Sequence, residues 1–455
     1  MKTNIEQTVP LRLQIENVHA VKKADIIIDG LTVLCGENGA GKSTIARLLE
    51  DAIEADLYFD DAYRAVLLTS FYHEVISKLR MFAQVVLRDS GQDIRWHEFK
   101  VMSGLMSHSA ACEQLDKFDR VLDELRSRLA TVSRRGDERR NRDILEVIKI
   151  VSSEIKVKSR TIESLMTAFR RRADMLRQKI TDIKTANLTY ENFNAAELYS
   201  PVLWDGNVIL SEMGRRVLAY SGNSTSVAER FISVKDVVYI ESPLISTLRW
   251  NEDGNVLTVS GNFAPLHSSG RYLNNVDEDF LMKSFSRIMH GTIEYKKTPQ
   301  QDRRWMYMRD DGEEFLLANS ATGIKSFALL TMLHSYGCLN KNTVLIVDEP
   351  EAHLHPRWVV EYARMIINLI MDSGVRVLMA SHSPDMINAL QSFAQAKSLD
   401  ERTRFYQAVP IGKSHPYDFK YINRGMDVGK IFDAFNKVYP DIEEFATDMK
   451  IGEQR

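Results

Sequence analysis

The segment from Gly36 to Ser43 constrains the fold of this chain more than any other. It reads GENGAGKS, which matches G-x-x-x-x-G-K-[S/T] at every fixed position. An apolar run, LTVLC, precedes it, and a stretch with helical spacing, STIARLLEDAIEADL, follows. A strand, a glycine-rich turn and a helix in that order form a loop whose backbone N–H groups and helix N-terminus bind phosphate. This order predicts an α/β fold.

The residue types in this loop predict what each residue contacts. Lys42 should reach the β- and γ-phosphates of a nucleotide, and the hydroxyl of Ser43 should bind Mg2+. Thr44 should contact the α-phosphate. The backbone that cradles the phosphates is expected to come from Gly36, Asn38, Gly39 and Gly41. A loop without a ligand is the alternative, and the strand before the motif argues against it.

A second apolar run, NTVLIV, ends in two adjacent acidic residues, Asp348 and Glu349. In phosphoryl-transfer enzymes an aspartate at the end of such a strand holds magnesium, generally through water. The next acidic residue can polarise the water that attacks the γ-phosphate. We therefore expect Asp348 to be a magnesium residue and Glu349 to be catalytic. A strand that ends in solvent-facing carboxylates is the alternative.

The segment DEPEAHLHP, residues 348–356, resembles the Walker B and D-loop segment of SMC-like ABC ATPases, which include RecF, Rad50 and OLD proteins. The sequence SHSP, residues 381–384, ends the next apolar run, as in those proteins. The resemblance implies an α/β head of ABC/SMC type that binds and hydrolyses ATP with Mg2+. It also implies that His382 senses the γ-phosphate, and that Leu354 and His355 lie between two heads.

The same resemblance implies a signature motif on a helix N-terminus before the acidic pair, and NSATGIKS, residues 319–326, stands there. The family usually has serine two residues before the glycine, whereas this chain has Ala321. Ser320 or Thr322 would then supply the hydroxyl beside Gly323. In such proteins the signature of one protomer contacts the γ-phosphate held by the other. The chain is therefore expected to form homodimeric head pairs or a higher homo-oligomer.

Two further points stay open at this stage. A metal site formed by His353, His355 and His382 is a weaker alternative, because the phosphate loop and its acidic partner already account for a cation. Gln84 and Gln92 are the candidates for the Q-loop glutamine of the family.

Residues 110–187 contain no proline, and their apolar residues follow heptad spacing. The first series is Leu115, Phe118, Leu122, Leu125, Leu129 and Val132, and the second is Ile148, Ile155, Ile162, Phe169, Leu176 and Ile183. We interpret the segment as an antiparallel coiled-coil hairpin with its tip near Gly136. Because the second arm is longer, part of it must pack elsewhere. An ordinary helical subdomain is the alternative.

Strand and helix patterns on both sides of this segment imply one α/β head that is interrupted by an insertion. We expect a first head lobe at 1–104 and a coiled-coil insertion at 105–190. The second head lobe should occupy 191–455 and include a short C-terminal tail. It would carry the signature, Walker B and the switch histidine.

Charge is uneven along the chain. Residues 113–187 contain 19 Lys and Arg against 13 Asp and Glu, a balance of +6, whereas the whole chain is at −3. The arginines gather near the hairpin tip and on the second arm, at Arg134, Arg135, Arg139, Arg140, Arg142 and Arg170–Arg172. A basic surface attracts DNA or acidic proteins. A solvated helical surface is the alternative.

Other features restrict the cellular setting. No run reaches the roughly 18 apolar residues of a membrane span. The first residues lack the apolar core of a signal peptide. The three cysteines are far apart in sequence, which fits a reduced compartment. We expect a cytoplasmic protein.

The layout of the chain resembles the standalone ATPases of two bacterial anti-phage defence systems, PARIS and Septu. This resemblance implies a homo-oligomer that holds a separately encoded nuclease effector and activates it on sensing an acidic phage protein. The segment after Pro384 shows no acidic cluster suited to a fused Toprim nuclease. A DNA-repair ATPase of RecF/Rad50 type is the alternative, and a nucleotide-gated scaffold with negligible turnover is a third reading.

Overall fold

The computed structural model divides the chain into two compact units. Met1–Asp56 and Glu191–Arg455 form the head unit, and Leu57–Tyr190 form the helical unit. The described residues are 9–57, 59–87, 106–132, 138–183, 206–221, 224–227, 229–241, 249–250, 256–257, 280–297, 303–335, 337–412 and 415–436. The insertion was expected to begin at residue 105. It begins at Leu57 instead, because the helices between residues 59 and 86 pack among its later helices.

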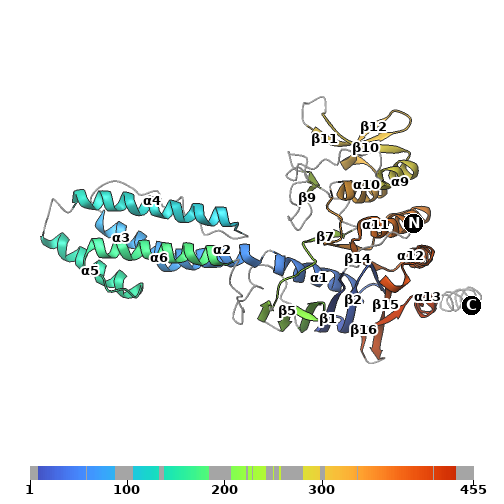
Figure 1. Cartoon of the computed structure of the whole chain (residues 1–455), viewed down its shortest axis with the longest axis horizontal. Helices are drawn as coiled ribbons and strands as arrows, with labels where there is room; N and C mark the ends of the chain where they lie inside the picture. Colours follow the sequence, from blue (N-terminus) through green and yellow to red (C-terminus); the bar gives the residue numbers. More distant parts are fainter. Residues whose placement is uncertain are drawn as a thin grey trace, which may run out of the picture. The chain divides into compact units, whose positions relative to one another are not determined.

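One large sheet forms the frame of the head unit (Figure 1). Among the described residues it has eleven strands in the order β6-β5-β4-β1-β2-β16-β15-β3-β14-β13-β7. The bounds are β1 (Leu11–Val18), β2 (Val21–Ile28), β3 (Leu31–Cys35), β4 (Asn207–Glu212), β5 (Arg215–Ser221), β6 (Ser224–Val227), β7 (Asp236–Glu241), β13 (Thr343–Asp348), β14 (Arg376–Ser381), β15 (Thr403–Gly412) and β16 (His415–Gly425). Strands from both chain ends alternate in this order, so the predicted α/β head built from both ends is confirmed.

The centre of this sheet is parallel. β15, β3, β14, β13 and β7 lie side by side with the same direction. Every residue of β3, β13 and β14 is buried, as expected for parallel strands covered on both faces. Parallel strands end at the same edge of a sheet, where ligands of α/β proteins usually bind. The residues that follow Cys35, Asp348 and Ser381 therefore meet at one edge.

Helices and two small sheets complete the head unit. The helices are α1 (Lys42–Leu57), α9 (Phe280–Met289), α10 (Thr322–Ser335), α11 (Pro356–Ser373), α12 (Pro384–Ala396) and α13 (Gly429–Asn436), and the small sheets are β8 (Arg249–Trp250) with β9 (Val256–Leu257), and β10 (Gly291–Lys297), β11 (Arg303–Arg309) and β12 (Glu314–Leu316). Figure 1 shows α9 and α10 between α11 and the β10–β12 sheet. None of the described helices is long and apolar enough to cross a membrane.

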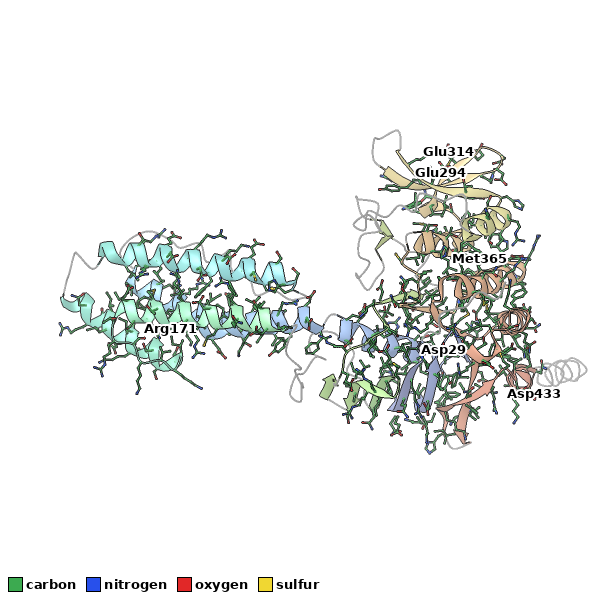
Figure 2. The ribbon with its side chains drawn as sticks, viewed as in Figure 1. Asp29, Arg171, Glu294, Glu314, Met365 and Asp433 are labelled. Atoms are coloured by element: carbon green, nitrogen blue, oxygen red, sulfur yellow. The ribbon has the colours of Figure 1, made fainter. Side chains whose placement is uncertain are left out.

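Local sequence sets the ends of α11. Pro356 occupies its first turn, where a missing N–H costs nothing, and His355 caps it. Gly374 follows its last residue with φ 70°, the left-handed conformation that ends many helices. The buried face of α11, which includes Met365 (Figure 2), belongs to the same apolar core as β13 and β14.

The helical unit buries most of the two apolar series, with Ile162 partly buried and the side chain of Val132 outside the described residues. Its elements are α2 (Phe59–Phe71), a π-helical turn η1 (Tyr72–Ile76), α3 (Ser77–Val86), α4 (His108–Val132), α5 (Glu138–Glu154) and α6 (Ile162–Asp182). Leu122 and Leu125 of α4 share one core with Phe169 and Leu176 of α6. α5 packs on α3 instead. This agrees with the expectation that part of the longer second arm packs on another element.

The predicted two-arm hairpin is wrong in its second arm, which is broken. α5 ends with N–H groups of Lys156 and Val157 bonded to the carbonyls of Ser153 and Ser152, at 3.1 and 2.8 Å. Lys156 has φ 54°, so it stands where a helix usually ends in glycine. Thr161 then caps α6. The segment is a bundle of helices, and the expected tip at Gly136 lies outside the described residues.

Candidate functional site

The phosphate loop connects β3 to α1, and its glycines meet two requirements. Gly39 and Gly41 have φ 81° and 86°, in the left-handed region that only glycine enters without strain. A Cβ on Gly41 would lie 2.6 Å from Cγ2 of Val21, and a Cβ on Gly36 would lie 2.7 Å from Cβ of Ala408. Close packing therefore excludes larger residues at Gly36 and Gly41.

Two strands from the far end of the chain support this loop. β15 lies beside β3. The hydroxyl of Tyr421, on β16, donates a hydrogen bond to the carbonyl of Ala40 at 3.0 Å. The loop leaves Asn38 exposed, and Thr44 is partly buried on the first turn of α1. Contacts with β15 and β16 thus support the loop backbone, while the part of the loop that carries Asn38 stays exposed.

Lys42 is the buried cation of the loop. Its side-chain Nζ donates to the carbonyls of Gly36 and Glu37, both at 3.0 Å. Burial lowers the pKa of Lys42, and the negative charges of Glu349 and Asp348 oppose that shift. The structure therefore brings the loop lysine and the strand-end acids, far apart in sequence, into one electrostatic environment.

Asp348 lies at the end of β13 and is only 3% exposed. The Tyr239 hydroxyl donates to its Oδ2 at 3.1 Å, and Ser43 also hydrogen-bonds to it. Burial raises the pKa of Asp348, and these two bonds counter the rise. Its other oxygen, Oδ1, is buried and has no hydrogen-bond partner among the described residues. A hydroxyl beside a carboxylate with an unused oxygen fits Mg2+, which prefers oxygen ligands.

The two residues that were expected to be catalytic lie together. Oε1 of Glu349 is 3.5 Å from Nδ1 of His382, and both side chains are partly exposed. The backbone N–H of Glu349 donates to the carbonyl of Ala380, at 2.9 Å, which ties the turn after β13 to β14. Glu349 has φ 49°, a left-handed conformation that strains a residue with a side chain.

Sequence reasoning gave no role to Tyr239 or Glu351. Tyr239 lies on β7, which pairs with β13, so only the strand pairing brings it to Asp348. Glu351 is buried behind His382, and its Oε1 accepts hydrogen bonds from the turn that carries this histidine. The one available signal for Glu351 was its position within DEPEAH.

The expected signature residues Ser320, Thr322 and Gly323 lie at the N-terminus of α10. A Cβ on Gly323 would be 2.5 Å from the ring of Trp358, so this glycine permits close packing on α11. Ser320 donates to the carbonyl of Leu316 at 3.4 Å. Within the described ranges no hydrogen bond connects these residues to the phosphate loop.

The histidine alternative finds no support. No group of three metal-ligating side chains occurs in the part of the chain that the structure describes. His355 instead accepts a hydrogen bond from the N–H of Arg357, at 3.3 Å, as the cap of α11. Of the two Q-loop candidates, Gln84 is exposed on α3 in the helical unit, and Gln92 lies outside the described residues.

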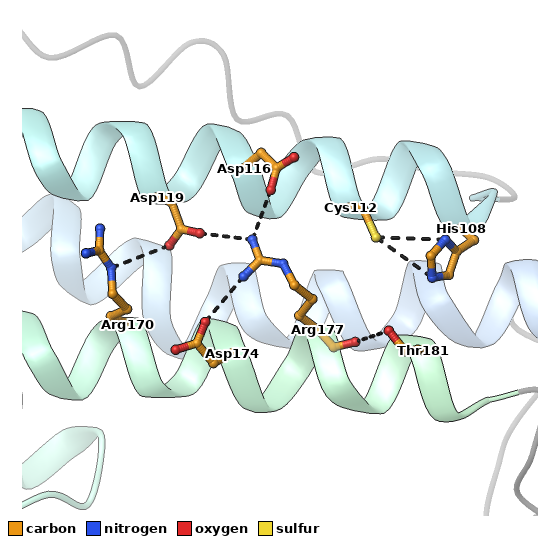
Figure 3. A network of polar contacts seen from close by, with 8 residues as sticks. All are labelled: His108, Cys112, Asp116, Asp119, Arg170, Asp174, Arg177 and Thr181. Carbon is orange, nitrogen blue, oxygen red and sulfur yellow. Dashed lines mark hydrogen bonds and ion pairs between the residues drawn. The ribbon is translucent and has the colours of Figure 1, made fainter.

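Most described arginines on α6 are paired within the helical unit. Arg177 donates to Asp116 and Asp119 of α4, at 3.0 and 2.9 Å (Figure 3). Arg170 pairs with Asp123 of α4 at 2.5 Å. Arg171 is exposed (Figure 2). Arg134 and Arg135, and the side chains of Arg139 and Arg140, lie outside the described residues. These pairs favour the solvated-surface interpretation for α6 over a DNA-binding one.

Comparisons with protein families agree with this site. An AAA ATPase domain model matches residues 259–387, and an AAA domain model matches residues 12–197. The first range contains Asp348, Glu349 and His382, and the second contains the phosphate loop. No curated protein matches the chain. The chain therefore matches AAA-type ATPase models over two ranges that together contain the phosphate loop and the acidic pair.

Several solved structures are also similar to this chain. The SMC head bound to the C-terminal winged-helix domain of ScpA has 10% identity and a TM-score of 0.38, and covers 92% of this chain and 98% of its own. The SMC head domain from Thermotoga maritima has 9% identity and a TM-score of 0.33, with 91% and 98% covered. An SMC head with an extended coiled coil from Pyrococcus furiosus has 10% and 0.33, with 94% and 100% covered.

Proposed function

We propose that the chain hydrolyses ATP with Mg2+ in a site that the head of a second copy completes. The observation that carries this proposal is the convergence of Lys42, Ser43 and Asp348 at the ends of two parallel strands, with Glu349 and His382 beside them. A buried lysine, a hydroxyl and two adjacent acids at this edge match the needs of phosphoryl transfer, which are positioning and charge stabilisation.

Each group has a defined task in this reaction. Lys42 and the loop amides would bind the β- and γ-phosphates, and Ser43 and Asp348 would hold Mg2+, which would supply charge neutralisation of the phosphates. Glu349 orients a water and accepts its proton as the water oxygen bonds to the γ-phosphorus. The bond from that phosphorus to the β–γ bridging oxygen breaks, which releases ADP and phosphate. His382 contacts the γ-phosphate and reports its presence.

Two substitutions test the assignment of the site. Lys42→Ala should abolish binding of a fluorescent ATP analogue, and Lys23→Ala, at an exposed position of β2, serves as the matched control. Glu349→Gln should keep nucleotide binding and lower kcat by roughly 10²–10⁴-fold, the usual contribution of a general base. Wild-type turnover by Glu349→Gln would show that Glu349 is not the base. Full biological activity of that variant would favour the nucleotide-gated scaffold.

Mixing two inactive variants tests whether the site is shared between protomers. One partner is Lys42→Ala and the other is the double variant Ser320→Ala, Thr322→Val, which avoids Gly323 because any side chain there meets Trp358. In a shared site, half of the dimers regain one of two sites, so an equal mixture should recover about a quarter of wild-type activity. A mixture that stays inactive contradicts the composite site.

We further propose that this ATPase acts in the cytoplasm as the regulatory component of an anti-phage system and controls a separately encoded nuclease. The layout of the chain, a head that an insertion divides and that carries EAHLHP and SHSPD in its second part, resembles the standalone defence ATPases and supports this role. Co-expression with the neighbouring genes, affinity purification and phage challenge test it. A nuclease that co-elutes, with protection lost in Lys42→Ala, supports the proposal. ATP turnover that DNA stimulates without any neighbour would favour the RecF/Rad50-type alternative.

A further inference from the structure

We infer that Glu351 is a positioning residue that holds His382 in place for ATP turnover. The inference rests on the ATP hydrolysis proposed above. Glu351 belongs to the turn after β13, and His382 belongs to the turn after β14, the neighbouring strand. A link between these turns joins the segment that carries the proposed base to the segment that carries the proposed γ-phosphate sensor.

One oxygen of Glu351 binds three donors of the second turn. Its Oε1 accepts from Oγ of Ser381 at 2.8 Å, from the N–H of His382 at 2.8 Å and from the N–H of Ser383 at 3.2 Å. The Glu351 side chain is 7% exposed. Hydrogen bonds to a buried carboxylate are stronger than those between neutral groups, because the acceptor is charged. This single atom therefore fixes the backbone on both sides of the histidine.

The same turn is held from its other end by α12. Oγ of Ser383 accepts from the N–H of Met386, at 3.3 Å, and caps that helix. The backbone of residues 381–383 thus lies between a rigid helix cap and the Glu351 carboxylate. The backbone of His382 is therefore fixed, whereas its side chain, which is 41% exposed, can still move.

One nitrogen of the His382 imidazole lies near two carboxylates with different surroundings. Its Nδ1 is 3.4 Å from Oε1 of Glu351 and 3.5 Å from Oε1 of Glu349. Glu349 is partly exposed and open to water, whereas Glu351 is buried, and within the described ranges its Oε2 has no hydrogen-bond partner. Glu351 is therefore placed to orient the histidine, and Glu349 is placed to reach solvent.

The inference predicts a separation of kcat from KM. Glu351→Ala removes the acceptor for three donors, and a misplacement of about 1 Å at a reacting group can cost about 100-fold in rate. We expect kcat to fall about 10–100-fold while KM for ATP stays within about threefold, because Lys42 and the loop are untouched. Glu351→Gln keeps one side-chain oxygen for the same donors and should restore kcat to within about fivefold of wild type.

The reactivity of His382 can also be measured by chemical modification, without ATP turnover. Carbethoxylation by diethyl pyrocarbonate, mapped by mass spectrometry, should modify His382 several-fold faster in Glu351→Ala than in wild type or Glu351→Gln. The exposed His353 and His355 are internal references whose rates should not change. Circular dichroism and thermal unfolding establish that each variant is folded, and the glutamine variant keeps the test valid when the alanine variant is not.

The results separate this inference from the proposed function. A wild-type chain without ATPase activity contradicts the proposed function, and the His382 modification rates still test the contact. An active wild type with unchanged kcat and unchanged His382 reactivity in Glu351→Ala overturns the inference. A Glu351→Gln variant that is as impaired as Glu351→Ala while His382 is modified at the wild-type rate also overturns it, because the loss would then come from the missing charge and not from a displaced His382.

Discussion

Tyr239 and Asp348 lie on neighbouring parallel strands and are joined through their side chains, the tyrosine hydroxyl donating to Oδ2 of the aspartate at 3.1 Å. Burial, followed by the charges of Asp348 and Glu241, raises the pKa of Tyr239, so the hydroxyl keeps its proton for this bond. The bond occupies one oxygen of Asp348, while Oδ1 accepts no hydrogen bond from the part of the chain that the structure describes. Tyr239 therefore sets which oxygen is available to a cation.

Tyr239→Phe should weaken the response to magnesium more than the response to nucleotide. Groups that orient metal ligands typically contribute 10–100-fold in metal affinity, so we expect the Mg2+ concentration for half-maximal turnover to rise about tenfold. Binding of a fluorescent ATP analogue in EDTA should not change. Magnesium titrations of both signals make the comparison, and Tyr417→Phe, at an exposed tyrosine, is the control. Equal magnesium curves for the two variants would contradict this role.

Glu50 on α1 should make stability depend on pH. Burial, and then the charges of Glu54 and Asp51, raise the pKa of Glu50 from 4.5 to about 8. The folded state therefore keeps a proton that the unfolded state releases. The free energy of unfolding falls as pH rises above about 4.5, and the loss is complete once pH exceeds about 8. Glu50→Gln should raise the melting temperature by about 2–4 °C at pH 8.5 and change it little at pH 4.5.

Differential scanning fluorimetry across this pH range measures the effect of Glu50→Gln. Glu16→Gln, at an exposed position of β1, is the matched control and should follow the wild-type profile. A Glu50→Gln profile that runs parallel to wild type at every pH would show that Glu50 does not hold a proton in the folded state.

Alanine substitutions at two loop glycines can distinguish the cost of backbone strain from the cost of steric contact. Gly39 and Gly41 have similar positive φ, but a Cβ at Gly39 meets nothing within 4 Å, whereas one at Gly41 meets Val21 at 2.6 Å. Gly39→Ala should cost about 1 kcal/mol of stability from strain alone, and Gly41→Ala about 2–3 kcal/mol. Only Gly41→Ala should displace the loop enough to abolish nucleotide binding. Thermal unfolding and nucleotide titration of both variants decide the point, and equal losses would contradict it.

Arg177 should stabilise the helical unit without binding DNA. Its guanidinium joins α6 to Asp116 and Asp119 of α4, and its side chain is 30% exposed. Arg177→Met keeps the aliphatic stem and should lower local stability by about 0.5–1 kcal/mol, an effect that 0.5 M salt reduces. Hydrogen exchange of α6 amides measures it, with exposed Arg171→Met as the control. Loss of DNA affinity in Arg177→Met at unchanged exchange rates would reverse this assignment.

The sequence predicted the elements that carry the site because their signals are local. The phosphate loop stands directly between an apolar run and a helical pattern, and Asp348 directly follows an apolar run. Tyr239 and Glu351 could not be assigned in this way, because strand pairing and burial bring them to Asp348 and His382. The hydrogen bond of Ser43 to Asp348 could be expected from the motif, whereas the hydrogen bond of Tyr239 on β7 could not.

The break between α5 and α6 escaped detection for a specific reason. The seven-residue apolar repeat continues through it at Ile155 and Ile162, and both residues pack with the helical core. The residue in the left-handed conformation is Lys156, where glycine would have indicated the end of a helix. Thr161, which caps α6 together with Ser164, was the signal that pattern matching overlooked.

The support that Tyr421 gives to Ala40 has a consequence for how the chain matures on the ribosome. β3 forms its sheet contacts with β14 and β15, both of which are synthesised long after the phosphate loop. A nascent chain that carries only the first part of the head thus has the loop residues without the strands that hold them. We expect nucleotide binding to appear only after β15 and β16 have been translated, so that chains truncated before these strands remain unable to capture ATP.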